Sequence, residues 1–214
     1  MNKFSSKSVD FMIVKFLKDS VLDKRVTNAI LRKKYAYLEA WVSIIGNLFL
    51  SIVKVFLGLM LNSISLIADA AHTVADVMTS VVVLLGFKIS SSPADEKHPY
   101  GHGRIEFIAS LIISVMLLFV GVEFGKSSYT RFLENTAVKG SYAVAIIMIL
   151  GAVFKEWMSQ FSIELGNRTN ASALIADAWH HRTDAIASLL VAFAIVASKF
   201  GYYKVDAIFG FGVS

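Results

Sequence analysis

The sequence contains no cysteine and only two prolines among its 214 residues. The absence of cysteine excludes disulfide bonds, thiolate metal sites, iron–sulfur clusters and a cysteine nucleophile. Charged residues are also scarce, at 17% of the chain, whereas soluble proteins carry about 25%. Together with a hydrophobic share of 56%, this composition excludes a disordered chain and argues against a soluble enzyme.

Five apolar segments are each long enough to cross a bilayer core, which is about 30 Å thick, and a sixth begins near the end of the chain. Because a backbone in lipid must satisfy its hydrogen bonds internally, we expect these segments to be helices. Their approximate limits are 38–61, 63–89, 104–124, 142–163, 171–200 and 205–214. The sequence therefore predicts an all-α integral membrane protein, a six-helix transmembrane bundle over 36–214 whose sixth helix is incomplete.

The first 35 residues carry nine Lys and Arg against three Asp. Their pattern predicts a basic amphipathic segment at the membrane surface, without a cleavable signal peptide. By the positive-inside rule, this charge places the N-terminus in the cytoplasm. We expect no nucleic-acid partner, because aromatic residues do not interleave with the basic ones as a binding platform requires.

An internal repeat is the strongest signal in the chain. LIADAAHTVADVMTS at 66–80 recurs as LIADAWHHRTDAIAS at 174–188. Both copies lie in predicted spans, where an ionisable residue costs roughly 2.5–3.5 kcal/mol on insertion scales. Each copy carries at least three such residues, so both copies bear a high free-energy cost of insertion, which a purely structural role does not account for.

The repeat predicts a metal site. His72 and Asp76 are four residues apart, as are His180 and Asp184, so each pair shares one face of a helix. Two such helices packed together offer two imidazoles and two carboxylates, a set suited to a tetrahedral divalent ion, with Zn²⁺ the first choice.

Further polar residues lie in the predicted spans. Asp69 and Asp177 precede the histidines by three residues, and we expect them to hold the imidazoles by hydrogen bonds or to carry protons rather than to bind metal directly. Lys54 and Lys155 are interpreted as helix-packing or near-interface groups.

The loop after the second span contains Asp95, His98 and His102, three metal-ligand types within eight positions. Glycines at 101 and 103 allow the loop to wrap an ion. Two readings stay open, a second metal site and a solvated polar loop.

At this point the chain, from about Tyr35 onward, resembles the cation diffusion facilitator family, which exports divalent metals in exchange for protons. The resemblance is carried by His72 and Asp76, by ADAWHHRTDA at 176–185, and by HPYGHGRIE at 98–106. It implies six transmembrane helices, both termini in the cytoplasm, a transport site between the second and fifth helices, and homodimers in a bacterial inner or plasma membrane.

By the same resemblance, the four repeat residues match the transport-site ligands, and the loop residues match a second metal site found in some members. Asn47, in a Gly-Asn pair of the first span, is implied to line the cavity. A site of two His and two Asp resembles the zinc-preferring pattern, with Co²⁺, Cd²⁺, Fe²⁺ and Mn²⁺ left open. The family's cytoplasmic C-terminal domain does not occur in this sequence, so we expect a shortened chain.

The ligand chemistry predicts the mechanism. Neutral imidazole and carboxylate bind metal, whereas protonated imidazole cannot, so acidification expels the ion and proton influx can drive metal efflux. We expect a transporter and not an enzyme, because a metalloprotease helix of the form His-Glu-x-x-His does not occur. The alternative is a metal-stapled structural or sensory membrane protein without transport.

Overall fold

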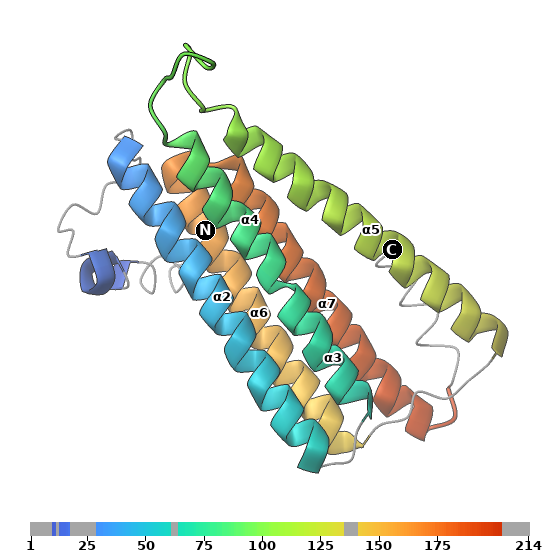
Figure 1. Ribbon diagram of the computed structural model, residues 1–214. Helices are drawn as coiled ribbons and strands as arrows, with labels where there is room; N and C mark the ends of the chain where they lie inside the picture. The colour runs from blue at the N-terminus through green and yellow to red at the C-terminus, as the bar shows by residue number, and fades with distance from the viewer. Residues whose placement is uncertain (1–9, 12, 18–28, 61–63, 135–140, 203–214) are drawn as a thin grey trace. The chain divides into compact units, whose positions relative to one another are not determined.

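The computed structural model describes residues 10–11, 13–17, 29–60, 64–134 and 141–202, and within them all regular structure is helical (Figure 1). The elements are a short π-helix η1 (Ile13–Leu17) and six α-helices: α2 (Ala29–Met60), α3 (Ile64–Ala75), α4 (Val77–Ser90), α5 (Ile105–Glu134), α6 (Tyr142–Thr169) and α7 (Ser172–Lys199). The all-α prediction is confirmed. The expected sixth span at 205–214 lies outside the described residues, as does much of the segment 1–35.

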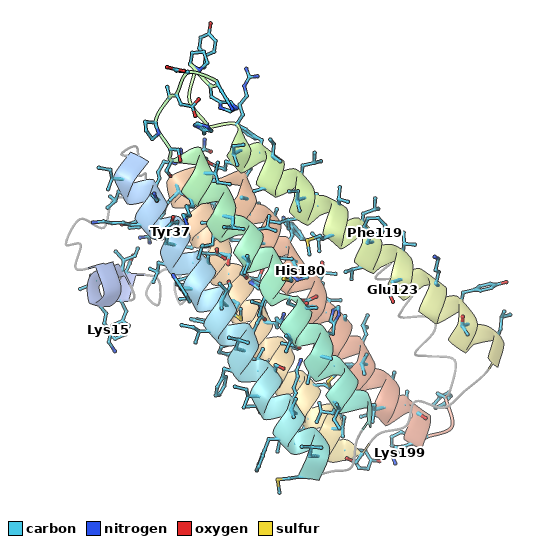
Figure 2. The ribbon with its side chains drawn as sticks, in the orientation of Figure 1. Lys15, Tyr37, Phe119, Glu123, His180 and Lys199 are labelled. Carbon is cyan, nitrogen blue, oxygen red and sulfur yellow. The ribbon has the colours of Figure 1, made fainter. Side chains whose placement is uncertain are left out.

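Five segments of the described chain are long and apolar enough to cross a membrane: Ile30–Met60, Asp69–Ser90, Ile105–Glu123, Tyr142–Thr169 and Ser172–Lys199. Apolar side chains that a soluble protein would bury lie on their surfaces. Phe119 of α5 is 71% exposed (Figure 2), and Phe56 of α2 is 62% exposed. Such a surface suits contact with lipid or with another apolar helix. The protein is therefore a multi-pass membrane protein.

Several helices extend beyond the limits expected from hydropathy. The first span begins at Ala29 rather than at about residue 38, so the boundary expected at residue 35 falls inside α2, and α5 continues to Glu134. Apolar residues mark only the part of a helix that lies in hydrocarbon. The backbone hydrogen bonds of a helix can continue into polar surroundings, and Lys and Arg are good helix formers.

The second predicted span is two helices, because the regular helix is interrupted at Asp76 between α3 and α4 (Figure 1). Asp76 keeps helical torsion angles, φ −61° and ψ −22°, and its carbonyl accepts hydrogen bonds from the Thr79 amide (3.2 Å) and hydroxyl (2.8 Å). The regular helix expected through His72 and Asp76 is therefore interrupted at this one residue, while the membrane-spanning segment continues from Asp69 to Ser90. α7, by contrast, carries His180 and Asp184 without a break.

The chain divides into two compact units. The first unit comprises residues up to 46, 76–114 and 157–180, and the second comprises 47–75, 115–156 and the chain from 181 onward. Each has its own apolar core. The first core includes Tyr35, Phe87, Ile113, Phe161, Leu165 and Leu174, and the second core is built on Leu66, Val144, Ala145, Met148, Ala192 and Ile195.

Within the first unit, arginines connect the ends of several segments. Arg32 of α2 forms an ion pair with Glu106 of α5 (3.1 Å) and donates to the Thr169 carbonyl at the end of α6 (2.7 Å). Arg168 forms an ion pair with Asp10 (2.8 Å). Arg32, one of the basic residues from which the N-terminus was predicted to be cytoplasmic, therefore also joins helix ends. A cation near the C-terminal end of a helix is stabilised by the exposed carbonyl groups there.

The repeat appears in the structure as a repeated contact. Ser51 of α2 donates to the Ala70 carbonyl of α3 (3.0 Å), and Ser159 of α6 donates to the Ala178 carbonyl of α7 (2.7 Å). The offset that separates the two copies of the repeat takes Ser51 to Ser159 and Ala70 to Ala178. The α2–α3–α4 segment is therefore repeated as α6–α7, with the two serine contacts in different units.

Candidate functional site

Asp76 and His180 form a buried pair in the first unit. Asp76 precedes α4, and His180, labelled in Figure 2, lies on α7. Each residue is 3% exposed, and Asp76 Oδ1 lies 3.5 Å from His180 Nε2. Donors bound to one tetrahedral Zn²⁺ at about 2.0–2.2 Å lie roughly 3.3–3.5 Å apart. The separation of these two atoms therefore suits two ligands of the same ion.

The second unit holds the other imidazole and carboxylate. A ring nitrogen of His72, on α3, and a carboxylate oxygen of Asp184, on α7, lie within 4.8 Å of one another. Asp184 is 7% exposed and forms an ion pair with Lys155 of α6, whose Nζ lies 2.8 Å from Asp184 Oδ2. His72 is more exposed than Asp184.

The two pairs are equivalent under the repeat. The offset between the copies takes His72 to His180 and Asp76 to Asp184, so each unit combines the histidine of one copy with the aspartate of the other. The sequence analysis grouped His and Asp four residues apart along one helix. The pairs that the structure brings together join two helices, which spacing along one helix could not reveal.

Asp69 pairs with a lysine in the second unit. Its Oδ2 lies 2.6 Å from Lys54 Nζ, and Lys54 also donates to the Thr73 hydroxyl (2.8 Å). Lys54 is 4% exposed. The structure thus gives Lys54 and Lys155 specific partners, Asp69 for Lys54 and Asp184 for Lys155. The interpretation of these lysines as packing groups missed both partners.

Asp177 lies in a different setting in the first unit. It is fully buried, and one of its carboxylate oxygens lies within 4.8 Å of one from Glu39, which is also fully buried. Glu39 accepts hydrogen bonds from the Ser43 hydroxyl (3.2 Å) and from the Ser162 hydroxyl. The sequence analysis did not single out Glu39. The available signal was an acidic residue inside an apolar span, where it is costly.

Asn47 is buried at the middle of α2, with no exposed surface. Neither its amide nitrogen nor its carbonyl oxygen has a hydrogen-bond partner among the described residues. A buried amide without a partner costs about 1–3 kcal/mol. Asn47 is therefore an unusual residue for a position that only packs against neighbouring helices.

The loop residues are brought together in the first unit. One donor atom from each of Asp95, His98 and His102 lies within 4.8 Å of the others. His98 Nδ1 lies 3.2 Å from Asp95 Oδ1, and His102 Nε2 lies 3.5 Å from Asp95 Oδ2. The loop turns at Gly101, whose φ of +80° favours glycine. Asp95 and His98 are exposed, while His102 is partly buried.

Asp95 also organises its own loop. Its Oδ1 accepts hydrogen bonds from the backbone amides of His98 (2.6 Å) and Lys97 (3.0 Å). The backbone hydrogen bond from His98, followed by that residue's side chain, lowers the pKa of Asp95 below its usual value. The carboxylate is therefore held in the ionised form that a cation requires.

A multi-pass helical protein whose spans bring His and Asp side chains together has the features of membrane proteins that handle cations. Residues 40–214 match the sequence model of a family described as the cation efflux transmembrane domain. The chain belongs to the cation diffusion facilitator family, whose members are transporters and not enzymes.

Individual relatives cover most of this chain. It is 41% identical to an uncharacterized transporter of Methanocaldococcus jannaschii over 79% of this chain and 60% of that protein. It is 36% identical to the magnetosome protein MamB of Magnetospirillum gryphiswaldense, over 81% and 59%. It is 33% identical to the manganese efflux system protein MneP of Bacillus subtilis, over 79% and 57%. The chain thus spans little more than half the length of these relatives.

Proposed function

We propose that this protein exports divalent metal cations from the cytoplasm in exchange for protons by alternating access, with Zn²⁺ as the preferred ion. The transport site consists of His72, Asp76, His180 and Asp184. The observation that carries the proposal is the juxtaposition of imidazole and carboxylate donors in membrane-spanning segments: the buried pair Asp76 and His180, and His72 within 4.8 Å of the buried Asp184.

Chain connectivity supports the grouping of all four donors in one site. His180 and Asp184 are four residues apart on the unbroken helix α7, which is a rise of about 6 Å. Asp76 follows His72 by the same number of residues. The two cross-helix pairs are thus separated by four residues along the chain at both of their members.

The donor set supports zinc as the preferred ion. Two imidazole nitrogens and two carboxylate oxygens match the ligands and the coordination number of tetrahedral Zn²⁺. Ca²⁺ prefers six to eight oxygens, and soft ions prefer sulfur, which this chain does not supply through cysteine. Co²⁺, Cd²⁺, Fe²⁺ and Mn²⁺ remain competing substrates, and one relative is named for manganese efflux.

Proton coupling follows from the same donors. An imidazole must lose its proton to bind a metal ion, so loading the site releases protons and protonation unloads it. A site on repeated helix pairs suits alternating access, since many transporters move such repeats around a fixed site. Asn47 is proposed to contact the ion or its water, and Asp69 and Asp177 to act on the site without binding the ion.

Three further features complete the proposal. Asp95, His98 and His102 form a second metal site outside the membrane-spanning segments. The N-terminus lies in the cytoplasm, in accord with the basic charge of the first 35 residues. The working unit is a homodimer in a bacterial inner or plasma membrane, whose exposed apolar helix faces meet lipid and the partner copy.

The test is zinc flux into proteoliposomes under an imposed pH gradient. Flux is expected to depend on the gradient and to be lost in both Asp76→Ala and Asp184→Ala. Glu123→Ala, an acidic residue on the exposed surface of α5 (Figure 2), is the control and is expected to keep it. Tight zinc binding without flux would instead support the alternative, a metal-stapled structural or sensory membrane protein.

A further inference from the structure

Lys155 is a buried cation on a proposed metal ligand. Its Nζ lies 2.8 Å from Asp184 Oδ2, and the two side chains are only 3% and 7% exposed. Both residues belong to the second unit, and both lie in membrane-spanning segments. A lysine at such depth is costly, and in membrane proteins such residues usually mark an ion pathway.

The repeat does not require this lysine. The residue equivalent to Lys155 in the first copy is Asn47, a neutral amide, and the residue equivalent to Lys54 in the second copy is Ser162. The serine contacts of Ser51 and Ser159 are present in both copies, whereas the buried lysine occupies a different position in each copy. The ion pair between Lys155 and Asp184 is therefore not explained by the architecture that the two copies of the repeat share.

We propose that Lys155 is a tethered counter-ion that competes with the transported metal for Asp184. This inference rests on the proposed function. The ammonium group binds a carboxylate oxygen that a metal ion would also use, and its positive charge opposes the approach of a divalent cation. When the ion leaves, Lys155 balances the buried carboxylate, so that the empty site does not carry two uncompensated negative charges.

The consequence concerns the affinity of the transport site for its metal ion, which is low enough for the ion to be released. A transport site must bind its ion well enough to load and weakly enough to unload. Because Lys155 is covalently attached, it is always available to displace the ion from Asp184. The lysine lowers the affinity of the site and shortens the lifetime of the bound ion.

The experiment compares two buried lysines, each paired with an aspartate. Lys155→Met removes the cation from a proposed ligand, and Lys54→Met removes it from Asp69, which is not one. Lys155→Gln retains a hydrogen-bond donor without the charge, and Lys155→Arg retains the charge. Zinc affinity of the purified full chain in detergent, and KM and kcat for zinc in proteoliposomes, are measured for each variant at one pH.

Removal of the charge is expected to tighten zinc binding by about tenfold or more, since a nearby unit charge typically changes such equilibria by one to three decades. Lys155→Met and Lys155→Gln should show this gain together with a lower KM and a lower kcat. Lys155→Arg and Lys54→Met should bind zinc like the unaltered chain. If Lys155→Met does not fold, the zinc affinity of Lys155→Gln, whose side chain keeps a hydrogen-bond donor toward Asp184, tests the inference in its place.

Two results overturn the inference. Zinc affinity that is unchanged or weaker in the folded neutral variants means that Lys155 only holds the helices together. The same gain in Lys54→Met means that the effect comes from overall charge rather than from Asp184. Failure of the unaltered chain to bind or move zinc rejects the proposed function itself, whereas normal binding and flux with unaffected neutral variants rejects only the role of Lys155.

Discussion

The two units contain equivalent donor pairs with different partners. In the first unit, Asp76 faces His180 across 3.5 Å. In the second, Asp184 lies near His72 and is also ion-paired with Lys155 at 2.8 Å. The duplication of the sequence therefore preserved the groups that can bind a metal and altered the charge around one of them.

The acids that precede the histidines differ in the same way. Asp69, in the second unit, is ion-paired with Lys54, whereas Asp177, in the first, lies near the carboxyl group of Glu39. Among the described residues, the buried lysines belong to the second unit. The comparison teaches that a repeat can keep the same His and Asp residues while the groups around equivalent acids differ, a lysine beside Asp69 and a second carboxyl group beside Asp177.

The largest effect on stability is expected at Asp184. Asp184→Ala removes the carboxylate that is ion-paired with the buried Lys155, and breaking a buried ion pair by removing one partner typically costs about 3–5 kcal/mol. Asp76→Ala should cost less, because its partner His180 can adopt a neutral form. The free energy of unfolding, measured for the purified chain in detergent, should therefore fall more for Asp184→Ala.

A double variant sharpens this test. Adding Lys155→Met to Asp184→Ala removes the stranded charge and should restore most of the lost stability. Equal losses in Asp76→Ala and Asp184→Ala, with no recovery in the double variant, would contradict the difference in charge between the two units.

The two units also differ in how closely their helices pack at a glycine, and substitutions there are expected to have an intermediate effect on stability. In the first unit, a Cβ added at Gly86 of α4 would lie 2.6 Å from Ala109 Cβ of α5. Such a clash needs a backbone shift, so Gly86→Ala is expected to destabilise the protein by about 1–3 kcal/mol. In the second unit, a Cβ at Gly151 would lie 3.6 Å from Lys54 Cε, an ordinary contact.

Gly151→Ala is therefore the matched control, with an unchanged or slightly raised stability from its better helix propensity. Thermal unfolding in detergent compares the two variants. Equal midpoints would show that α4 and α5 are not packed as closely as the Gly86–Ala109 distance requires.

The smallest effect concerns the loop of the first unit. The pKa of Asp95 is lowered, chiefly by the backbone hydrogen bond from His98. The stabilisation from this depressed pKa is present above the unfolded value of about 3.9 and is lost as pH falls through the lower folded value. Carboxyl chemical shifts from NMR should show Asp95 titrating below an acid in an unfolded peptide of the loop. Coincident titrations would mean that the loop hydrogen bonds do not form in solution.

Much of the fold followed from local sequence. Apolar runs predicted five spans at the right places, because a bilayer imposes length and internal hydrogen bonding on any crossing segment. Helix ends were less accurate, as at Ala29 and Glu134, since hydropathy reports the hydrocarbon boundary rather than the end of backbone hydrogen bonding. The interruption at Asp76 was also missed, because its apolar neighbours continue through it.

The candidate site could be predicted from the sequence only in part. The repeat revealed the donor types His72, Asp76, His180 and Asp184, since ionisable residues in lipid are rare enough to stand out. Glu39 was a detectable signal that was passed over. The partners of these groups lie on other helices, and a sequence read along one helix contains no distance between helices.

The kinds of residue in the spans, their spacing and their duplication were thus encoded locally, because helical periodicity and the cost of charge in lipid act on neighbouring residues along the chain. The pairing of Asp184 with Lys155, separated by 29 positions, was set by the packing of α6 against α7 within the second unit. Charge balance inside a membrane depends on which side chains meet across helices, and that is a property of the folded chain alone.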